Sequence, residues 1–325
     1  MTRTRTWWMA AIALSALGTA PAQDDDPRRL VKQLRSRDVA ERLAAAEALG
    51  RLGPDAAPAA AALAATLGDD QASVARAAAL ALGRIGKRAQ RYVKRALHDS
   101  DTERLAAVAL GEMGEAGVPL LPDLTRLWRK EGLEIRAAVE EGLTGLGDLA
   151  VPHLRPLVLD PGLATYVMQY LRDADPALAR ALVPELIELA PRAWFGSPEA
   201  LTVLGHARDP RALPVLVEAV QQYDPADPVF ATKAERAVRA LGEFGPVAKP
   251  ALPAMLALLG DDDATPRLKA FTLRALGDVG IPAEPVLAHA AHARAAGGKV
   301  AEAAKCNCPG HPTWDRATRR PTVCG

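Results

Sequence analysis

A short motif that recurs along the chain constrains the fold more than any other feature. The string Ala-Leu-Gly-x-apolar-Gly occurs five times, and a degenerate copy, GLTGLG, stands at 142–147. Adjacent copies are 33, 28, 33, 98 and 35 residues apart, and the spacing of 98 is close to three times 33. Self-similarity with a fixed period of roughly 20–50 residues indicates a repeat architecture. The final glycines of the six copies are Gly53, Gly86, Gly114, Gly147, Gly245 and Gly280.

The long gap is expected to hold two copies that have lost their final glycines, at 170–173 and 203–206, which gives about eight repeats. Each repeat is predicted to fold as two helices. In 73–85, Val74, Ala77, Ala78, Ala81 and Leu82 recur at three- and four-residue spacing, which is typical of the apolar side of a helix. Gly86 is expected to end this helix in the left-handed conformation that glycine accepts at the C′ position.

Proline is placed where helices begin. The second helix of a repeat is predicted to carry Pro in its first turn, as at Pro119 and Pro152, because the first-turn amides have no intrahelical partner. Later helices are expected to begin at a capping residue followed by Pro, at Asp175-Pro176, Ser197-Pro198, Asp209-Pro210, Asp227-Pro228 and Thr265-Pro266. No segment shows sustained period-two alternation, so no sheet is predicted.

Composition agrees with a stack of helices. Alanine supplies 68 of the 325 residues, whereas aromatic residues make up only 4%. Helices packed on both sides by neighbours need small side chains for close approach. Hydrophobic residues reach 49%, which argues against disorder over most of the chain. The net charge of +1 argues against a globally basic nucleic-acid-binding protein.

The first 22 residues have the pattern of an export signal. Arg3 and Arg5 precede an apolar run from Trp7 to Gly18, and Ala20-Pro21-Ala22 follows as a cleavage site before Gln23. The alternative is an uncleaved anchor, but the run is too short for a hydrocarbon core of about 30 Å. We therefore predict a signal peptide at 1–22, a solenoid at 23–296 and a Cys-containing tail at 297–325. The mature chain would carry a net charge of −1, lack a transmembrane segment and be periplasmic or extracellular, of bacterial type.

The helix pairs, the Ala-Leu-Gly signature and an arginine in the first helix together resemble the HEAT-repeat family, most closely its short HEAT-like subgroup, which is also found in bilin lyases. The arginines are Arg42, Arg76, Arg104 and Arg136. The resemblance covers roughly 27–296, with an eroded motif at 148–230. It implies an all-α, right-handed solenoid of about eight helix pairs, whose second helices line a concave binding surface.

A run of cations at 84–95 contains no acid. Arg88, Arg91 and Arg95 are spaced i, i+3 and i+7, so they are expected to share one side of the second helix, with Tyr92 beside them. Two interpretations stay open. The side chains could bind an anionic partner, or they could form a solvated surface paired with acids of neighbouring repeats. The predicted export argues against a nucleic-acid ligand.

Further candidates extend this surface in the next repeats. Trp and Arg are enriched at interface hot spots. Trp128 could equally be a core residue, because it continues an apolar stripe with Leu121 and Leu124. His153 is expected at the surface. The partner-binding candidates are Arg88, Arg91, Tyr92, Arg95, Arg126, Trp128, His153 and Arg155.

The tail holds all three cysteines. Cys306, Cys308, Cys324 and His311 could form a four-ligand zinc site. A disulfide from Cys306 or Cys308 to Cys324 is the competing interpretation in an oxidising compartment. The third possibility is that the tail forms neither a zinc site nor a disulfide. Apart from zinc at this tail, no cofactor is expected.

No catalytic motif stands out. The chain lacks a Gly-x-Ser-x-Gly elbow, a Gly-x-Gly-x-x-Gly loop and a His-Glu-x-x-His sequence. No catalytic residue is therefore assigned. The sequence predicts an exported, non-enzymatic scaffold that binds a protein partner. That partner would be acidic if the cationic run is a binding surface. The alternatives are a lyase-like or cofactor-handling enzyme or subunit, and a metal-binding module centred on the tail.

Overall fold

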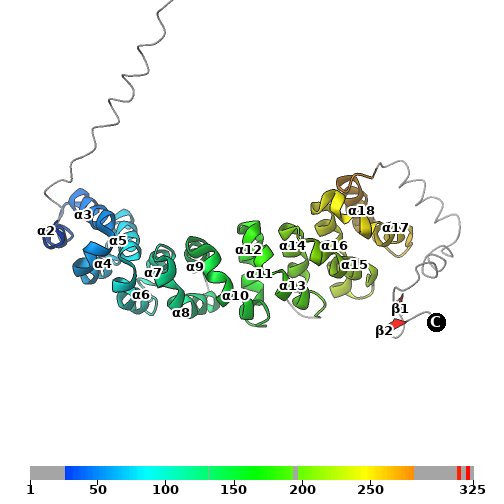
Figure 1. Cartoon of the computed structure of the whole chain (residues 1–325), viewed down its shortest axis with the longest axis horizontal. Coiled ribbons are helices and arrows are strands. Elements are labelled where there is room, and N and C mark those ends of the chain that lie inside the picture. Colours follow the sequence, from blue (N-terminus) through cyan, green and yellow to red (C-terminus); the bar gives the residue numbers. More distant parts are fainter. Residues whose placement is uncertain (1–25, 131, 193–196, 282–312, 316–319, 323–325) are drawn as a thin grey trace, which may run out of the picture. The chain divides into compact units, whose positions relative to one another are not determined.

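The computed structural model describes residues 26–130, 132–192, 197–281, 313–315 and 320–322. Consecutive helix pairs form an all-α solenoid, as the sequence predicted (Figure 1). The chain divides into two compact units, Met1–Leu149 and Ala150–Gly325. Each unit is described by itself.

Unit 1 contains two layers of helices after a short leading helix, α2 (Pro27–Gln33). The first helices of its repeats are α3 (Val39–Leu52), α5 (Ala72–Ile85), α7 (Glu103–Gly111) and α9 (Leu133–Leu146). The second helices are α4 (Ala60–Thr66), α6 (Gln90–Ala96) and α8 (Leu121–Arg126). Figure 1 shows α3, α5, α7 and α9 along one side of the unit and α4, α6 and α8 along the other.

Unit 2 continues the alternation of first and second helices. The first helices are α11 (Ala164–Asp173), α14 (Ser197–Ala207), α16 (Pro228–Glu243) and α18 (Pro266–Asp278). The second helices are α10 (Val151–Val158), α13 (Val183–Leu189), α15 (Leu213–Gln221) and α17 (Leu252–Gly260), and a short extra helix, α12 (Pro176–Ala181), lies between α11 and α13 in the sequence.

The described part of the chain therefore contains eight first helices, in agreement with about eight predicted repeats. The two copies expected without their final glycines are also present. Residues 170–173 end α11, and residues 203–206 lie in the last turns of α14. The repeat persists through the middle of the chain although its sequence signature is eroded there.

Glycine and alanine allow successive first helices to approach very closely. A Cβ placed on Gly83 of α5 would lie 2.5 Å from the carbonyl oxygen of Ala109 in α7 and would overlap the Cβ of Glu112. In unit 2, a Cβ on Gly205 of α14 would lie 2.7 Å from the Cα of Ala240 in α16. Real Cβ atoms do not come this near to another backbone, so these glycines set the spacing of the first-helix layer.

The final glycines of the motif all have positive φ, at Gly53, Gly86, Gly114, Gly147, Gly245 and Gly280. Three of them do not have the backbone of a left-handed helix, however. Gly86 has φ 69° and ψ −134°, and Gly53 and Gly147 are similar. This is the conformation of the first central residue of a type II′ turn, which is dominated by glycine. All of the final glycines except Gly280 start a 3₁₀ segment that leads to the second helix, such as Gly86–Ala89.

The eroded middle repeats turn without glycine. Ala174 follows α11 in an extended conformation, with ψ 174°. Arg208 follows α14 with φ 51°, the one non-glycine residue of the described chain with a positive φ. A side chain in this region is strained. The loss of the motif at 203–206 therefore has a conformational cost at the next turn.

The predicted cap-and-proline helix starts are confirmed at four places. The side chains of Asp175, Asp227 and Thr265 accept hydrogen bonds from backbone N–H groups of α12, α16 and α18. Asp209 does the same for the 3₁₀ segment Pro210–Ala212. Pro152 lies in the first turn of α10, as expected.

Two expectations were wrong. Pro119 lies inside the 3₁₀ segment Gly114–Leu120, and Pro122 takes the first turn of α8 instead. A small sheet also exists, because β1 (Thr313–Asp315) pairs antiparallel with β2 (Arg320–Thr322). Strands of three residues are too short for alternation to reveal them.

Substituting alanine at matched glycines tests the close packing. Gly83 and Gly277 both occupy the third position of the motif, but a Cβ on Gly277 meets nothing within 4 Å in the described chain. Gly83→Ala should lower the free energy of unfolding by about 1–3 kcal/mol through overpacking. Gly277→Ala should raise it by about 0.5–1 kcal/mol through helix propensity. Urea or thermal unfolding measures both, and an unchanged stability for Gly83→Ala would contradict the packing.

Candidate functional site

The cationic surface of unit 1 consists of Lys87, Arg88, Arg91 and Arg95, from α6 and the 3₁₀ segment before it. All four side chains are exposed. Arg88 lies in the 3₁₀ segment rather than in the helix itself. No carboxylate of the described chain lies within 4 Å of the charged nitrogens of these four residues.

Neighbouring cations are paired, in contrast. The Arg84 guanidinium lies 3.6 Å from a carboxylate oxygen of Glu112, and the Lys94 ammonium lies 3.7 Å from one of Asp123. Pairing with acids of neighbouring repeats therefore describes part of the cationic run, and exposed charge that could meet an anionic partner describes the rest. Arg84 and Lys94 are paired across repeats, while the cationic surface keeps its charges available.

Tyr92 orders the centre of this surface. The Arg91 guanidinium lies 4.6 Å from the centroid of the Tyr92 ring and donates a hydrogen bond of 2.6 Å to the Tyr92 Oη. Tyr92 itself is half-buried. This stacking limits the rotamers of Arg91 and lowers the entropy that Arg91 would lose on binding a partner.

Arg126 is held by the neighbouring repeat. It is exposed, and its guanidinium donates to the carbonyl of Leu97 at 3.2 Å and to Nδ1 of His98 at 3.3 Å. Because arginine has no acceptor, His98 accepts at Nδ1 and donates from Nε2 to Asp123 at 2.9 Å. This network ties α6 to α8, so Arg126 serves first as a link between repeats.

Trp128 does not belong to a binding surface. Its side chain is completely buried, together with Leu121 and Leu124. It lies in the 3₁₀ segment Leu127–Arg129 that follows α8. The core alternative for the apolar stripe is confirmed, and the assignment of Trp128 to a partner surface was wrong.

His153 and Arg155 belong to α10 in unit 2, whereas the other candidates belong to unit 1. Arg155 is exposed and donates to Glu185 at 2.5 Å and to the carbonyl of Ala181 at 3.0 Å. His153 is half-buried, not a surface histidine as expected, and this burial lowers its pKa. These two residues therefore belong to a different unit from the cationic surface.

Lys233 of α16 is a buried cation that the sequence analysis did not single out. It is 1% exposed, and its ammonium donates to the carbonyl of Arg192 at 2.8 Å. Burial lowers the pKa of Lys233, while Glu218 and Asp227 act in the opposite direction. The hydrogen bond identifies Lys233 as a link between the end of the α13 repeat and α16.

The remaining candidates lie outside the described residues. They are Cys306, Cys308, His311 and Cys324. Zinc, a disulfide or neither therefore stays a prediction for the tail, as does the signal peptide at 1–22. Within the described ranges, no three or more His, Cys, Asp or Glu side chains are grouped so that they could hold a metal ion. No helix in these ranges is long and apolar enough to cross a membrane.

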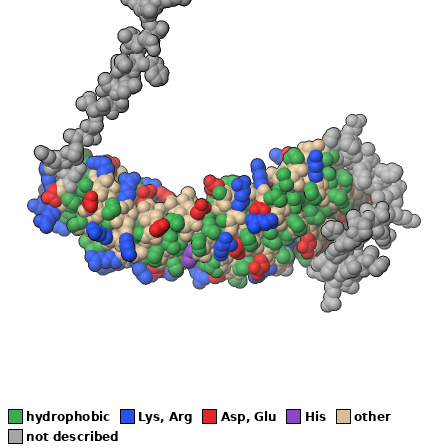
Figure 2. All heavy atoms as spheres, in the orientation of Figure 1, with side chains coloured by type: hydrophobic (Ala, Val, Ile, Leu, Met, Phe, Trp, Pro, Cys, Tyr) green, Lys and Arg blue, Asp and Glu red, His purple; other side chains and the backbone are tan. Residues whose placement is uncertain are grey.

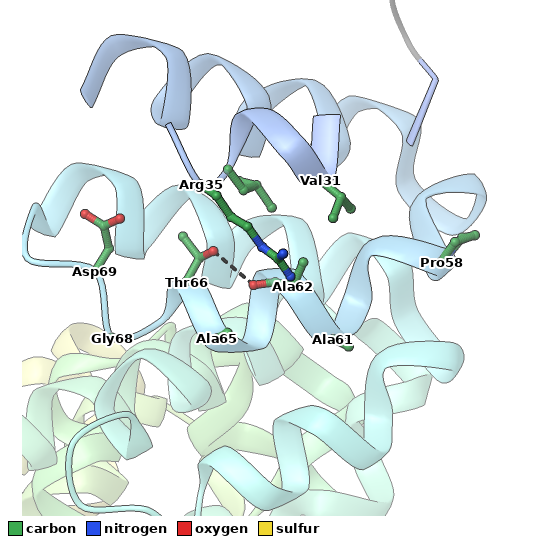
Figure 3. Close-up of a pocket in the computed structure, with 10 residues that line it drawn as sticks. Val31, Arg35, Pro58, Ala61, Ala62, Ala65, Thr66, Gly68 and Asp69 are labelled. Carbon is green, nitrogen blue, oxygen red and sulfur yellow. Dashed lines mark hydrogen bonds between the residues drawn. The ribbon is translucent and has the colours of Figure 1, made fainter. Parts of the chain in front are cut away.

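The sequence analysis missed a pocket between α2 and α4 (Figure 3). Its volume is about 470 Å³. Asp69 lies at its edge, but the Arg42 guanidinium binds both Asp69 carboxylate oxygens, at 2.8 and 2.9 Å, and holds the pKa of Asp69 below its usual range. The lining residues are Val31, Leu34, Arg35, Pro58, Ala61, Ala62, Ala65, Thr66, Gly68 and Asp69.

Two stacked helix layers built from repeats of about 33 residues define an α-solenoid. Residues 27–111 match the family model of HEAT repeats, which confirms over these residues the resemblance found in the sequence motif. No curated protein matches the chain.

Three solved structures are similar to this chain. An engineered protein has 18% identity and a TM-score of 0.37, covering 87% of this chain and 85% of its own. The complex of CpcE and CpcF of phycocyanin lyase from Nostoc sp. has 20% identity and a TM-score of 0.31, covering 71% and 93%. A structure described under a phosphorylation switch that controls the interaction between cadherin and β-catenin has 17% identity and a TM-score of 0.36. The match covers 82% of this chain and 63% of that one. TM-scores this low do not carry the partners or activities of those proteins over to this chain.

The lowered pKa of His153 predicts a pH dependence of stability. Below pH 6.5, the unfolded chain takes up a proton at His153 more readily than the folded chain does, so the stability falls as the pH falls. His153→Gln removes this contribution. The difference between the melting temperatures at pH 7.5 and pH 5.5 should therefore be smaller in the variant than in the unchanged protein, and an equal difference would contradict the burial of His153.

Proposed function

We propose that this chain is an exported, non-enzymatic HEAT-repeat scaffold that binds an acidic segment of a protein partner through the second-helix layer of unit 1. One observation carries the proposal. Lys87, Arg88, Arg91 and Arg95 are exposed cations with no carboxylate of the described chain within 4 Å, although cations next to them are paired.

Charge that is not neutralised within the protein favours an acidic partner. A carboxylate that approaches an unpaired arginine gains hydrogen bonds without first breaking an existing ion pair. The planar fork of arginine suits carboxylates in particular. A cluster of like charges also speeds the encounter with an oppositely charged surface. Tyr92 adds an aromatic side chain of the type that is common at interface hot spots.

Two further features support the proposal. Residues 1–22 have the pattern of an export signal with a cleavage site before Gln23, which supports export of the mature chain. Repeat solenoids present extended surfaces on rigid arrays of helices, which suits a scaffold. The expectation that the second helices form the concave side stays part of the proposal.

Charge reversal on the cationic surface tests the proposal. The mature chain with Arg88→Glu, Arg91→Glu and Arg95→Glu would be used to capture partners from the exported protein fraction, next to the unchanged chain. We expect recovery of the main partner to fall about tenfold or more, because several central contacts are lost and each factor of ten corresponds to about 1.4 kcal/mol. Higher salt should weaken capture by the unchanged chain.

A matched control reverses three exposed cations elsewhere, at Arg51, Lys249 and Arg274. This variant has the same net charge as the test variant, so it separates a local effect from a general electrostatic one. Equal recovery of the partner by the test variant and the unchanged chain would overturn the proposal. An equal loss in both variants would show attraction to net charge alone and would overturn it as well.

A further inference from the structure

The pocket between α2 and α4 has a floor of small apolar side chains. Ala61, Ala62 and Ala65 of α4 line it, and Pro58 closes one end. Figure 3 shows Arg35 reaching over this floor, with its guanidinium beside Ala62, and Val31 on the same side. Thr66 donates its hydroxyl to the carbonyl of Ala62 at 2.9 Å, so the one hydroxyl of the lining is already satisfied. We call this pocket and the exposed side of α4 the α4 trough.

Cations border the α4 trough on the side of α2. Helix α2 contains Arg28, Arg29 and Lys32 and no acid, and Arg35 follows it. Figure 2 shows Lys and Arg side chains gathered at the α2 end of unit 1. Arg35 is exposed, and no carboxylate of the described chain lies within 4 Å of its guanidinium. Arg42 pairs with both Asp69 and Asp70, whereas Arg35 is a cation of the lining with no carboxylate partner in the described chain.

The cationic surface lies on the next second helix, α6. Gln90 and Lys94 of α6 reach toward the following repeat, where Gln90 donates to the carbonyl of Ala116 and Lys94 approaches Asp123. A helix turns roughly 100° per residue, so Tyr92 projects from the opposite side of α6, toward the preceding repeat. In chain order, the uncharged helix α4 lies between Arg35 and the cationic surface, and neither has a carboxylate of the described chain within 4 Å.

We propose that the α4 trough binds one segment of a partner protein that carries an apolar anchor side chain flanked by Asp or Glu. This proposal rests on the function proposed above and specifies the ligand of the same surface. The anchor would lie on the alanine floor of the pocket, and the acidic residues would pair with Arg35 on one side and with Arg88 and Arg91 on the other. Burying the anchor supplies affinity, and the cations supply orientation.

The shape of the trough favours a peptide segment over other anions. A free phosphate or sulfate would gain nothing from the alanine and proline floor. The pocket has a volume of about 470 Å³ and is open to solvent, so a side chain presented by a partner segment can reach its floor. A floor of alanine also lets a partner helix approach closely. An acidic helix with leucine on one side combines both requirements.

Peptide binding to the purified mature chain tests this proposal. The probe is a fluorescein-labelled helical peptide of Leu, Ala and Glu, with Leu along one side and Glu along both borders. Two comparison peptides replace Leu by Ser or Glu by Lys. Fluorescence anisotropy should show that the Leu/Glu peptide binds about tenfold or more tightly than either comparison peptide. Equal affinity for the Ser-substituted peptide would overturn the proposal, because charge alone would then explain binding.

Variants of the chain locate the binding. Ala65→Trp fills the trough at an exposed position, and Ala257→Trp places the same bulk on an exposed position of α17 as a control. We expect Ala65→Trp and Arg35→Glu each to weaken binding of the Leu/Glu peptide about tenfold, and Ala257→Trp to leave it unchanged. Unchanged affinity in Ala65→Trp would overturn the proposal.

These outcomes are distinguishable from failure of the proposed function. Peptide binding that is weakened by charge reversal at Arg88, Arg91 and Arg95 but not by Ala65→Trp would keep the cationic surface and reject the trough. Partner recovery that is unaffected by charge reversal would reject the proposed function itself. Sedimentation of the unchanged chain completes the test. Self-association that Ala65→Trp abolishes would assign the trough to a second copy and overturn the assignment to a partner segment.

Discussion

The structure depends on how closely successive first helices approach each other. At Gly83 and Gly205 there is no room for even one methyl group between neighbouring helices. Contact at this distance needs glycine or alanine at the crossing point, which explains why one residue in five is alanine and why the Ala-Leu-Gly string recurs in register. The glycine three positions later then turns the chain into the second helix through a backbone conformation dominated by glycine.

Because the first helices make the closest contacts, the exposed side chains of the second helices can vary from repeat to repeat. The first-helix layer carries the tightest approaches, so the second helices can differ in chemistry from repeat to repeat without loss of the stack. Helix α4 exposes alanine, whereas α6 exposes arginine. The links between repeats on this side are polar and local, such as the network of His98, Asp123 and Arg126. Specificity for a partner can therefore reside in one or two repeats of unit 1.

The helical repeat was predictable from the sequence because the motif is local and periodic. The phase of the glycines placed even the eroded copies at the ends of α11 and α14. Individual side chains were harder to place. Trp128 sits in a short 3₁₀ segment, so helical periodicity alone could not choose between core and surface, and Arg155 is paired with Glu185, 30 residues away. The pocket under Arg35 is lined from α2 and α4, which are separated in the sequence by α3, so no local pattern encodes it.

The central claim is that carboxylates of a partner lie on the second-helix layer of unit 1. Zero-length cross-linking of the captured complex, which joins carboxylates to lysine ammonium groups in direct contact, measures this most directly. We predict that cross-links from the partner concentrate at Lys87 and Lys32, and that exposed Lys249 in unit 2 forms few. Cross-links concentrated at Lys249, with none at Lys87 or Lys32, would contradict the account.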